Sequence, residues 1–285
     1  MEVTMTKSVF GHLKTGEEVT LYRFTNTTGA YVEILNYGGI VKKVMVPDKE
    51  KTLVDVAVGF DDLQRYEQLD CPPGAVVSMS GCQDRTAFAH ALWEEVECSN
   101  NAVTFFRRFR CEPDGGDLDV FIRYLWVDYE RLVLDIAARC DRETEVNLTS
   151  NCLFRLDHGD DLSAHEWRTF GEWEETTEGT LIPIEETPFG NNVFTPAVLG
   201  EKRFFVAKSA EIRPLAEVIS PVSELSLSAY SDICGIALEV TEDPEPGVRL
   251  QQMFSAVSGK EQTLLKPGEE WKHRIIFGFD RIYKG

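Results

Sequence analysis

In the segment Arg131-Leu132-Val133-Leu134-Asp135-Ile136, every second residue is a leucine or an isoleucine. A period of two places these side chains on one face of an extended chain, which is typical of a β-strand with one buried face. The same period occurs in residues 31–35 and 235–240. We therefore predict that half-buried strands make up most of the fold.

Turn-forming residues separate these apolar segments. Clusters of Asn, Asp, Gly and Pro occur at residues 26–29, 113–117, 157–161 and 244–247. Such residues favour tight turns, and short connections indicate antiparallel pairing. Sustained helical periodicity is missing, and residues 60–66 predict at most a short helical turn. We expect an all-β fold of antiparallel strands with few short helical turns. No flexible linker divides residues 1–285, which predicts a single domain.

Composition and charge narrow the classes of partner. Hydrophobic residues make up 43% of the chain, which favours a packed globular core. The net charge of -19 would repel nucleic acid and anionic lipid headgroups, so neither is expected as a partner. The seven cysteines are scattered without CxxC pairs, and we interpret them as reduced thiols with no metal site. The sequence shows no signal-peptide pattern and no apolar run of roughly 18 residues, so we expect a cytoplasmic location.

Short motifs occur in a fixed order along nearly the whole chain. They include Asn36-Tyr37-Gly38-Gly39, Gly59-Phe60-Asp61-Asp62-Leu63, Val146-Asn147-Leu148-Thr149, Leu153-Phe154-Arg155-Leu156 and Leu265-Lys266-Pro267-Gly268-Glu269. This series resembles the aldose 1-epimerases, the galactose mutarotase family. The resemblance implies a galactose mutarotase-like supersandwich with a hexose-type sugar in a cleft on a concave sheet face. It implies no cofactor, and a small-molecule sugar as the partner.

Aldose 1-epimerases interconvert the α and β anomers of hexoses. A base must take a proton from the anomeric hydroxyl and an acid must protonate the ring oxygen, so that the ring opens and recloses. In the family a glutamate is the base and a histidine is the acid, while a second histidine, an arginine and an aspartate bind sugar oxygens.

The two proton-transfer positions are changed in this chain. The acid histidine corresponds to Asn151, and an amide does not hold and release a proton near neutral pH. The base glutamate corresponds to Ser258. Two residues could replace the lost groups: Glu261, if the alignment shifts along the strand, and His90, close to a shortened loop.

The three sugar-binding positions are changed as well. Met79 stands in place of the arginine, Cys82 in place of the second histidine and Lys202 in place of the aspartate. No catalytic residue of the family is therefore intact. Lys202, if it faces the cleft, would favour an anionic ligand such as a sugar phosphate or a sugar acid.

The first hypothesis is a carbohydrate-binding protein, a pseudoenzyme whose epimerase reaction is weak or lost. Its hydrogen-bonding groups would come from Asn151, Gln251 or Gln252. An aromatic ring would provide a stacking platform for the sugar, with Trp167 and Trp173 as candidates.

Two alternatives stay open. An active epimerase would need relocated groups drawn from His90, His158, His165 or Glu261. A protein-interaction module would instead use the acidic surface to recruit a basic partner. The acidic run at residues 172–178 is interpreted as a solvated loop or an edge-strand face.

Overall fold

The computed structural model describes residues 2–80, 86–111, 116–157, 159, 161–190, 193–208, 211–242, 244–255 and 260–282. Strands dominate these residues, and the helical segments are α1 (Leu63–Gln68), α2 (Pro196–Leu199), α3 (Lys260–Thr263) and the 3-10 turn η1 (Ile184–Glu186). The all-β fold predicted from the sequence is confirmed, and α1 overlaps the helical turn expected at residues 60–66. The single domain stays a prediction. No helix in the described ranges has the length and apolar composition needed to cross a bilayer.

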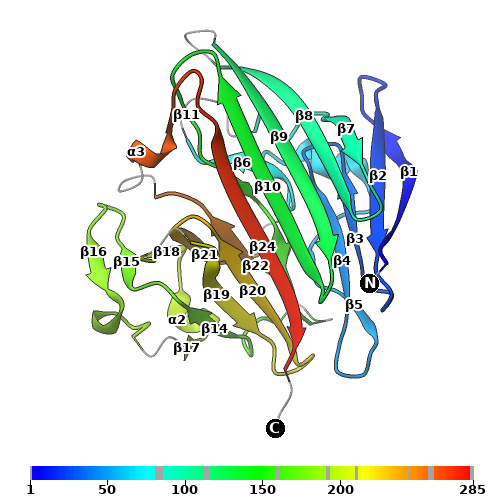
Figure 1. The fold of residues 1–285 in the computed structure, drawn as a ribbon. Coiled ribbons are helices and arrows are strands. Elements are labelled where there is room, and N and C mark those ends of the chain that lie inside the picture. Colours follow the sequence, from blue (N-terminus) through cyan, green and yellow to red (C-terminus); the bar gives the residue numbers. More distant parts are fainter. Residues whose placement is uncertain are drawn as a thin grey trace.

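The largest sheet contains the alternating segment that predicted the fold. In order across the sheet, its nine strands are β17 (Val193–Phe194), β14 (Glu166–Thr169), β19 (Arg213–Ile219), β20 (Leu225–Ser231), β24 (Trp271–Arg281), β10 (Arg131–Cys140), β9 (Gly116–Val127), β8 (Ala102–Cys111) and β7 (Glu94–Cys98). Neighbouring strands are antiparallel. Leu132, Leu134 and Ile136 of β10 are all buried, as their period of two requires. Figure 1 shows β8, β9, β10 and β24 side by side.

Two further large sheets and two short strand pairs complete the architecture. The five-stranded sheet has the order β1 (Thr4–His12), β2 (Glu18–Thr25), β3 (Tyr31–Leu35), β4 (Val41–Pro47) and β5 (Leu53–Asp55). The six-stranded sheet has the order β13 (Leu153–Phe154), β22 (Gly247–Gln252), β21 (Gly235–Thr241), β18 (Arg203–Val206), β15 (Trp173–Glu175) and β16 (Leu181–Pro183). The short pairs are β6 (Val76–Ser78) with β12 (Leu148–Ser150), and β11 (Thr144–Glu145) with β23 (Leu264–Leu265).

The three large sheets share one continuous cluster of buried apolar side chains. It includes Phe24 and Val44 from the five-stranded sheet, Leu134 from the nine-stranded sheet, and Phe205 and Leu250 from the six-stranded sheet. Removing these side chains from water drives the sheets together. The cluster therefore decides which face of β22 is inward, and it leaves the opposite face of that strand for other groups.

The motif Asn36-Tyr37-Gly38-Gly39 connects β3 to β4 and positions β6. Gly39 has a φ of 59°, in the left-handed region that favours glycine. A Cβ at this position would lie 2.5 Å from the Ile122 Cδ1 of β9, so a larger residue would have to displace the Ile122 side chain. The Gly38 carbonyl accepts a hydrogen bond from the Val76 backbone N–H over 2.9 Å. This hydrogen bond positions β6, and β6 in turn pairs with β12.

Candidate functional site

Asn147, directly before β12, ties this strand to the chain that leaves β22. Its Nδ2 donates to the Phe254 carbonyl over 2.9 Å, and its Oδ1 accepts from the Phe254 backbone N–H over 3.2 Å. The Leu148 carbonyl accepts from His273 Nδ1 over 3.0 Å. These bonds fix the backbone of β12, which leads into Asn151.

Three polar side chains, Asn151, Gln251 and Lys202, form a connected group that we call the amide cluster. Asn151 is 4% exposed, and its Nδ2 donates to the backbone carbonyls of Cys71 (3.0 Å) and Pro72 (3.1 Å). Its Oδ1 accepts from Gln251 Nε2 over 3.3 Å. Gln251 Oε1 accepts from Lys202 Nζ over 2.9 Å. The structure therefore brings together Asn151 and Lys202, which are far apart in the sequence.

The strand register places further side chains on the face that carries Gln251. Gln251 of β22 pairs with Ala237 of β21, which pairs with Phe204 of β18. Phe204 in turn pairs with Glu175 of β15. Paired residues of antiparallel strands point to the same face, so these residues form a cross-strand row about 14 Å long, at roughly 4.8 Å per strand. Trp173, two residues before Glu175, shares this face and is partly exposed.

Two glutamates of the acidic run at residues 172–178 are buried, which corrects the interpretation of this run as solvated. Glu174 and Glu175 are each 7% exposed, and their strand lies between β16 and β18. Glu175 Oε1 accepts from Ser255 Oγ over 2.6 Å, and Glu174 Oε1 accepts from Arg203 Nη1 over 3.2 Å. Sequence reasoning missed Glu175 because a run of acidic residues normally marks a hydrated surface.

None of the four histidines in the described ranges hydrogen-bonds to the amide cluster. His273 is buried, and burial lowers its pKa to about 4. Burial also lowers the pKa of His165. His90 Nδ1 lies 2.7 Å from Tyr37 Oη, and burial raises the pKa of Tyr37 to about 12. His12 is exposed. No imidazole among these residues therefore joins the amide cluster.

Met79 and Gln252, two further residues named from the sequence, differ in placement. The Met79 backbone N–H donates to the Asn147 carbonyl over 2.7 Å, and its side chain packs against a second apolar cluster. Gln252 is fully buried on the face of β22 opposite to Gln251, because successive strand residues alternate. Within the described ranges, neither polar atom of the Gln252 amide has a partner. Gln252 is therefore not part of the amide cluster.

The two tryptophans proposed as stacking platforms have different environments. Trp167 is fully buried in β14, and its ring stacks on Phe194 with a centroid distance of 6.3 Å. It is part of the core and offers no surface to a ligand. Trp173 is partly exposed, and Lys208 Nζ lies 5.6 Å from its ring centroid. Only Trp173 is placed so that it could contact a sugar.

Four residues named from the sequence have side chains that the structure does not describe. Cys82, His158 and Ser258 lie outside the described residues. Glu261 lies in α3, and its side chain is outside the described part. Their predicted roles stay predictions.

The described groups on this face can bind hydroxyls. Side-chain amides donate and accept without titrating, the Lys202 ammonium donates, and the Glu175 carboxylate accepts. Together with partly exposed aromatic rings at Trp173 and Phe204, they are typical of a site for a small polar ligand. No group of three or more His, Cys, Asp or Glu in the described ranges is arranged to hold a metal ion.

Curated relatives match almost the whole chain, although no family model matches it. Galactose mutarotases from Mus musculus and Sus scrofa are 25% and 26% identical, and each match covers 97% of this chain and 99% of the relative. These matches extend over 346 residues, more than the 285 of this chain, so the relatives contain segments with no counterpart here. An aldose 1-epimerase from Streptococcus thermophilus is 23% identical over 61% of this chain and 59% of the relative.

Solved structures share the architecture. A galactose 1-epimerase from Lactobacillus acidophilus has a TM-score of 0.80 at 13% identity, covering 99% of this chain and 100% of that one. An aldose epimerase homologue from C. elegans has a TM-score of 0.80 at 18% identity, covering 91% and 98%.

The sheets and their shared core thus define a galactose mutarotase-like β-sandwich protein. Its sequence matches along nearly the full length support membership of the aldose 1-epimerase, or galactose mutarotase, family at 25–26% identity.

Proposed function

We propose that this chain is a carbohydrate-binding member of the family in which the anomer-exchange reaction is lost. The ligand is a hexose-type sugar on the face of the six-stranded sheet that carries Glu175, Phe204 and Gln251. The observation that supports this proposal most directly is the bonding of Asn151, the residue that corresponds to the family's acid histidine.

Asn151 acts as a structural link. Both hydrogens of its Nδ2 serve backbone carbonyls, those of Cys71 and Pro72, and its Oδ1 accepts from Gln251. The side chain therefore holds the loop before β6 against β22 and has no proton to transfer near neutral pH. General acid catalysis contributes about 10²- to 10⁴-fold, so its loss alone would remove most of the rate enhancement.

The remaining groups favour binding over turnover. Lys202 Nζ is held by Gln251 Oε1, and Glu175 provides an acceptor further along the cross-strand row. A pyranose has hydroxyls for both groups and an apolar C–H face for the rings of Trp173 and Phe204. Lys202 stands where the family has an acceptor, which extends the ligand class to hexose phosphates and sugar acids.

The first experiment measures catalysis. Exchange between the α and β anomers of galactose and glucose is followed by proton NMR, with and without the full-length protein. We expect the exchange rate to equal the spontaneous rate in buffer. Exchange that grows in proportion to protein concentration would overturn the loss of activity and support the relocated-group alternative.

The second experiment measures binding. Galactose, glucose and their phosphates are titrated against the protein by calorimetry, with Glu175→Gln and Lys202→Met as test variants. The matched controls are Glu270→Gln and Lys272→Met, an exposed ion pair of 2.6 Å at the start of β24 and just before it. We expect the test variants to weaken binding and the controls to leave it unchanged. Wild-type protein that binds none of these sugars would contradict a carbohydrate-binding function on this face.

A further inference from the structure

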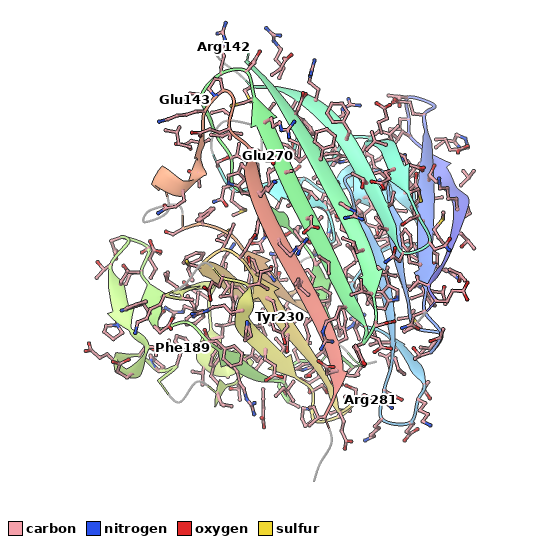
Figure 2. The ribbon with its side chains drawn as sticks, in the orientation of Figure 1. Arg142, Glu143, Phe189, Tyr230, Glu270 and Arg281 are labelled. Atoms are coloured by element: carbon pink, nitrogen blue, oxygen red, sulfur yellow. The ribbon has the colours of Figure 1, made fainter. Side chains whose placement is uncertain are left out.

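A cavity of about 550 Å³ opens at one end of the molecule, and we call it the end cavity. Its apolar lining comes from Val46 and Pro47 of β4, Leu225 of β20 and Phe279 of β24. Arg281 lies at the lower end of β24 in Figure 2 and also lines the cavity. The volume is within the range of roughly 300–1,000 Å³ that is typical of small-molecule sites. None of its lining residues belongs to the amide cluster or to the cross-strand row.

The β9–β10 turn lines this cavity with two residues in the left-handed conformation. Tyr129 has a φ of 62° and Glu130 a φ of 50°. Turns of this kind favour Asn-Gly, because residues with larger side chains are strained at positive φ. At both Tyr129 and Glu130 we therefore look for contacts that offset the backbone strain.

Glu130 makes such contacts within the fold. Its Oε1 accepts from Thr28 Oγ1 over 3.0 Å and from Asn26 Nδ2 over 3.3 Å. Its carbonyl accepts from the Phe279 backbone N–H over 3.1 Å. These bonds tie the turn to the β2–β3 connection and to β24. They therefore offset the backbone strain at Glu130.

The Tyr129 carbonyl accepts from Arg131 Nη1 over 2.6 Å, but its side chain has no contact comparable to those of the Glu130 carboxylate. The residue is 72% exposed, and its side chain makes no hydrogen bond and no aromatic contact within the described ranges. A large ring that is held in a strained turn, without an internal partner, points to an interaction with a ligand. Tyrosine is suited to this role because it combines an apolar face with a polar hydroxyl.

The charges of the cavity indicate the class of ligand. Two cationic residues, Lys51 and Arg281, and two anionic ones, Glu130 and Asp280, line it. Asp280 Oδ2 already accepts from Arg131 Nη2 over 2.7 Å. Balanced charge gives no advantage to an anion or a cation, whereas a ligand with many hydroxyls can use both donors and acceptors.

We infer that the end cavity is a second carbohydrate site, and that it binds a neutral saccharide whose C–H face stacks on Tyr129. The saccharide hydroxyls reach the polar rim at Lys51 and Glu130. This site does not depend on the proposed sugar site of the six-stranded sheet.

The test uses backbone amide NMR spectra of the full-length protein titrated with lactose and with maltotriose. We expect the amide signals of Thr28, Lys51 and Tyr129 to shift with a saturable dependence on at least one saccharide. Tyr129→Ala should weaken this binding about three- to tenfold, as expected for a lost stacking contact. Tyr129→Phe keeps the ring and should bind as the wild type does.

The outcomes separate the two sites. Shifts at Gln251 and Glu175 that persist in Tyr129→Ala report the face of the six-stranded sheet alone, and Glu175→Gln leaves the end cavity intact. Absence of shifts at Thr28, Lys51 and Tyr129, or unchanged affinity in Tyr129→Ala, would overturn the inference. A change in sedimentation of Tyr129→Ala without a loss of saccharide binding would assign Tyr129 to a protein interface instead.

Discussion

The turn at Tyr129 and Glu130 shows a local conflict between sequence and backbone. Positive φ at a residue other than glycine costs on the order of 1–3 kcal/mol. At Glu130 three hydrogen bonds offset this cost. At Tyr129 the one hydrogen bond described is from Arg131 Nη1 to the carbonyl, and the side chain makes none within the described ranges, so the strain should be measurable as lost stability.

Replacing Tyr129 by glycine is expected to raise the free energy of unfolding by about 1 kcal/mol, because glycine adopts this φ without steric cost and its greater freedom in the unfolded chain offsets only part of the gain. Urea denaturation measures the difference. Tyr129→Ala is the matched control, since alanine retains the strain. Equal stability of the glycine and alanine variants would show that the turn is not strained at this position.

At the scale of elements, β6, β12, β13 and β22 are joined by few backbone pairs. β6 and β12 pair over three residues, and β13 and β22 over two. Side-chain amides supply the missing connections, with Asn147 bonded to the chain after β22 and Asn151 to the loop before β6. These short elements therefore depend on two asparagines.

Truncating Asn151 to alanine is expected to lower the free energy of unfolding by about 1–3 kcal/mol, because two backbone carbonyls and the Gln251 amide lose a partner. Thermal and urea denaturation provide the measurement. Asn100→Ala, at an exposed turn, serves as the control and should have no effect. If both variants were equally stable, Asn151 would not be the structural link described above.

At the scale of the whole molecule, buried histidines make folding sensitive to acid. His273 is fully buried between Ser231 and Leu148, and its Nε2 accepts from Ser231 Oγ over 3.0 Å. Its pKa of about 4 lies below the value of about 6.5 expected in the unfolded chain. Between these two values the unfolded chain binds a proton that the folded protein does not bind, so stability falls as the pH is lowered through this window.

The expected loss from His273 reaches about 3 kcal/mol near pH 4, and the lowered pKa of His165 acts in the same direction. Urea denaturation at pH 7.5, 6 and 5 measures the trend. His273→Gln has no titrating group at this position, so its unfolding free energy should depend less on pH. The same pH dependence in both proteins would exclude His273 as the origin.

The sequence by itself determined the class of fold and the resemblance to the aldose 1-epimerases. The alternation in residues 131–136 and the ordered series of motifs are both patterns of residues close together along the chain. Both can therefore be recognised without coordinates. The strands and the mutarotase-like architecture were confirmed. The connection of Lys202 to Asn151 through Gln251 was not predictable in the same way.

Only the tertiary structure decided which side chains meet. Lys202 and Gln251 are 49 residues apart in the sequence, and Gln251 and Asn151 are 100 apart, yet hydrogen bonds join them. Burial of Glu175 follows from the strands on either side of β15, although its own sequence resembles a hydrated loop. The local sequence pattern predicts on which face of a strand a side chain lies. The packing of strands that are distant in the sequence decides which side chains it contacts there.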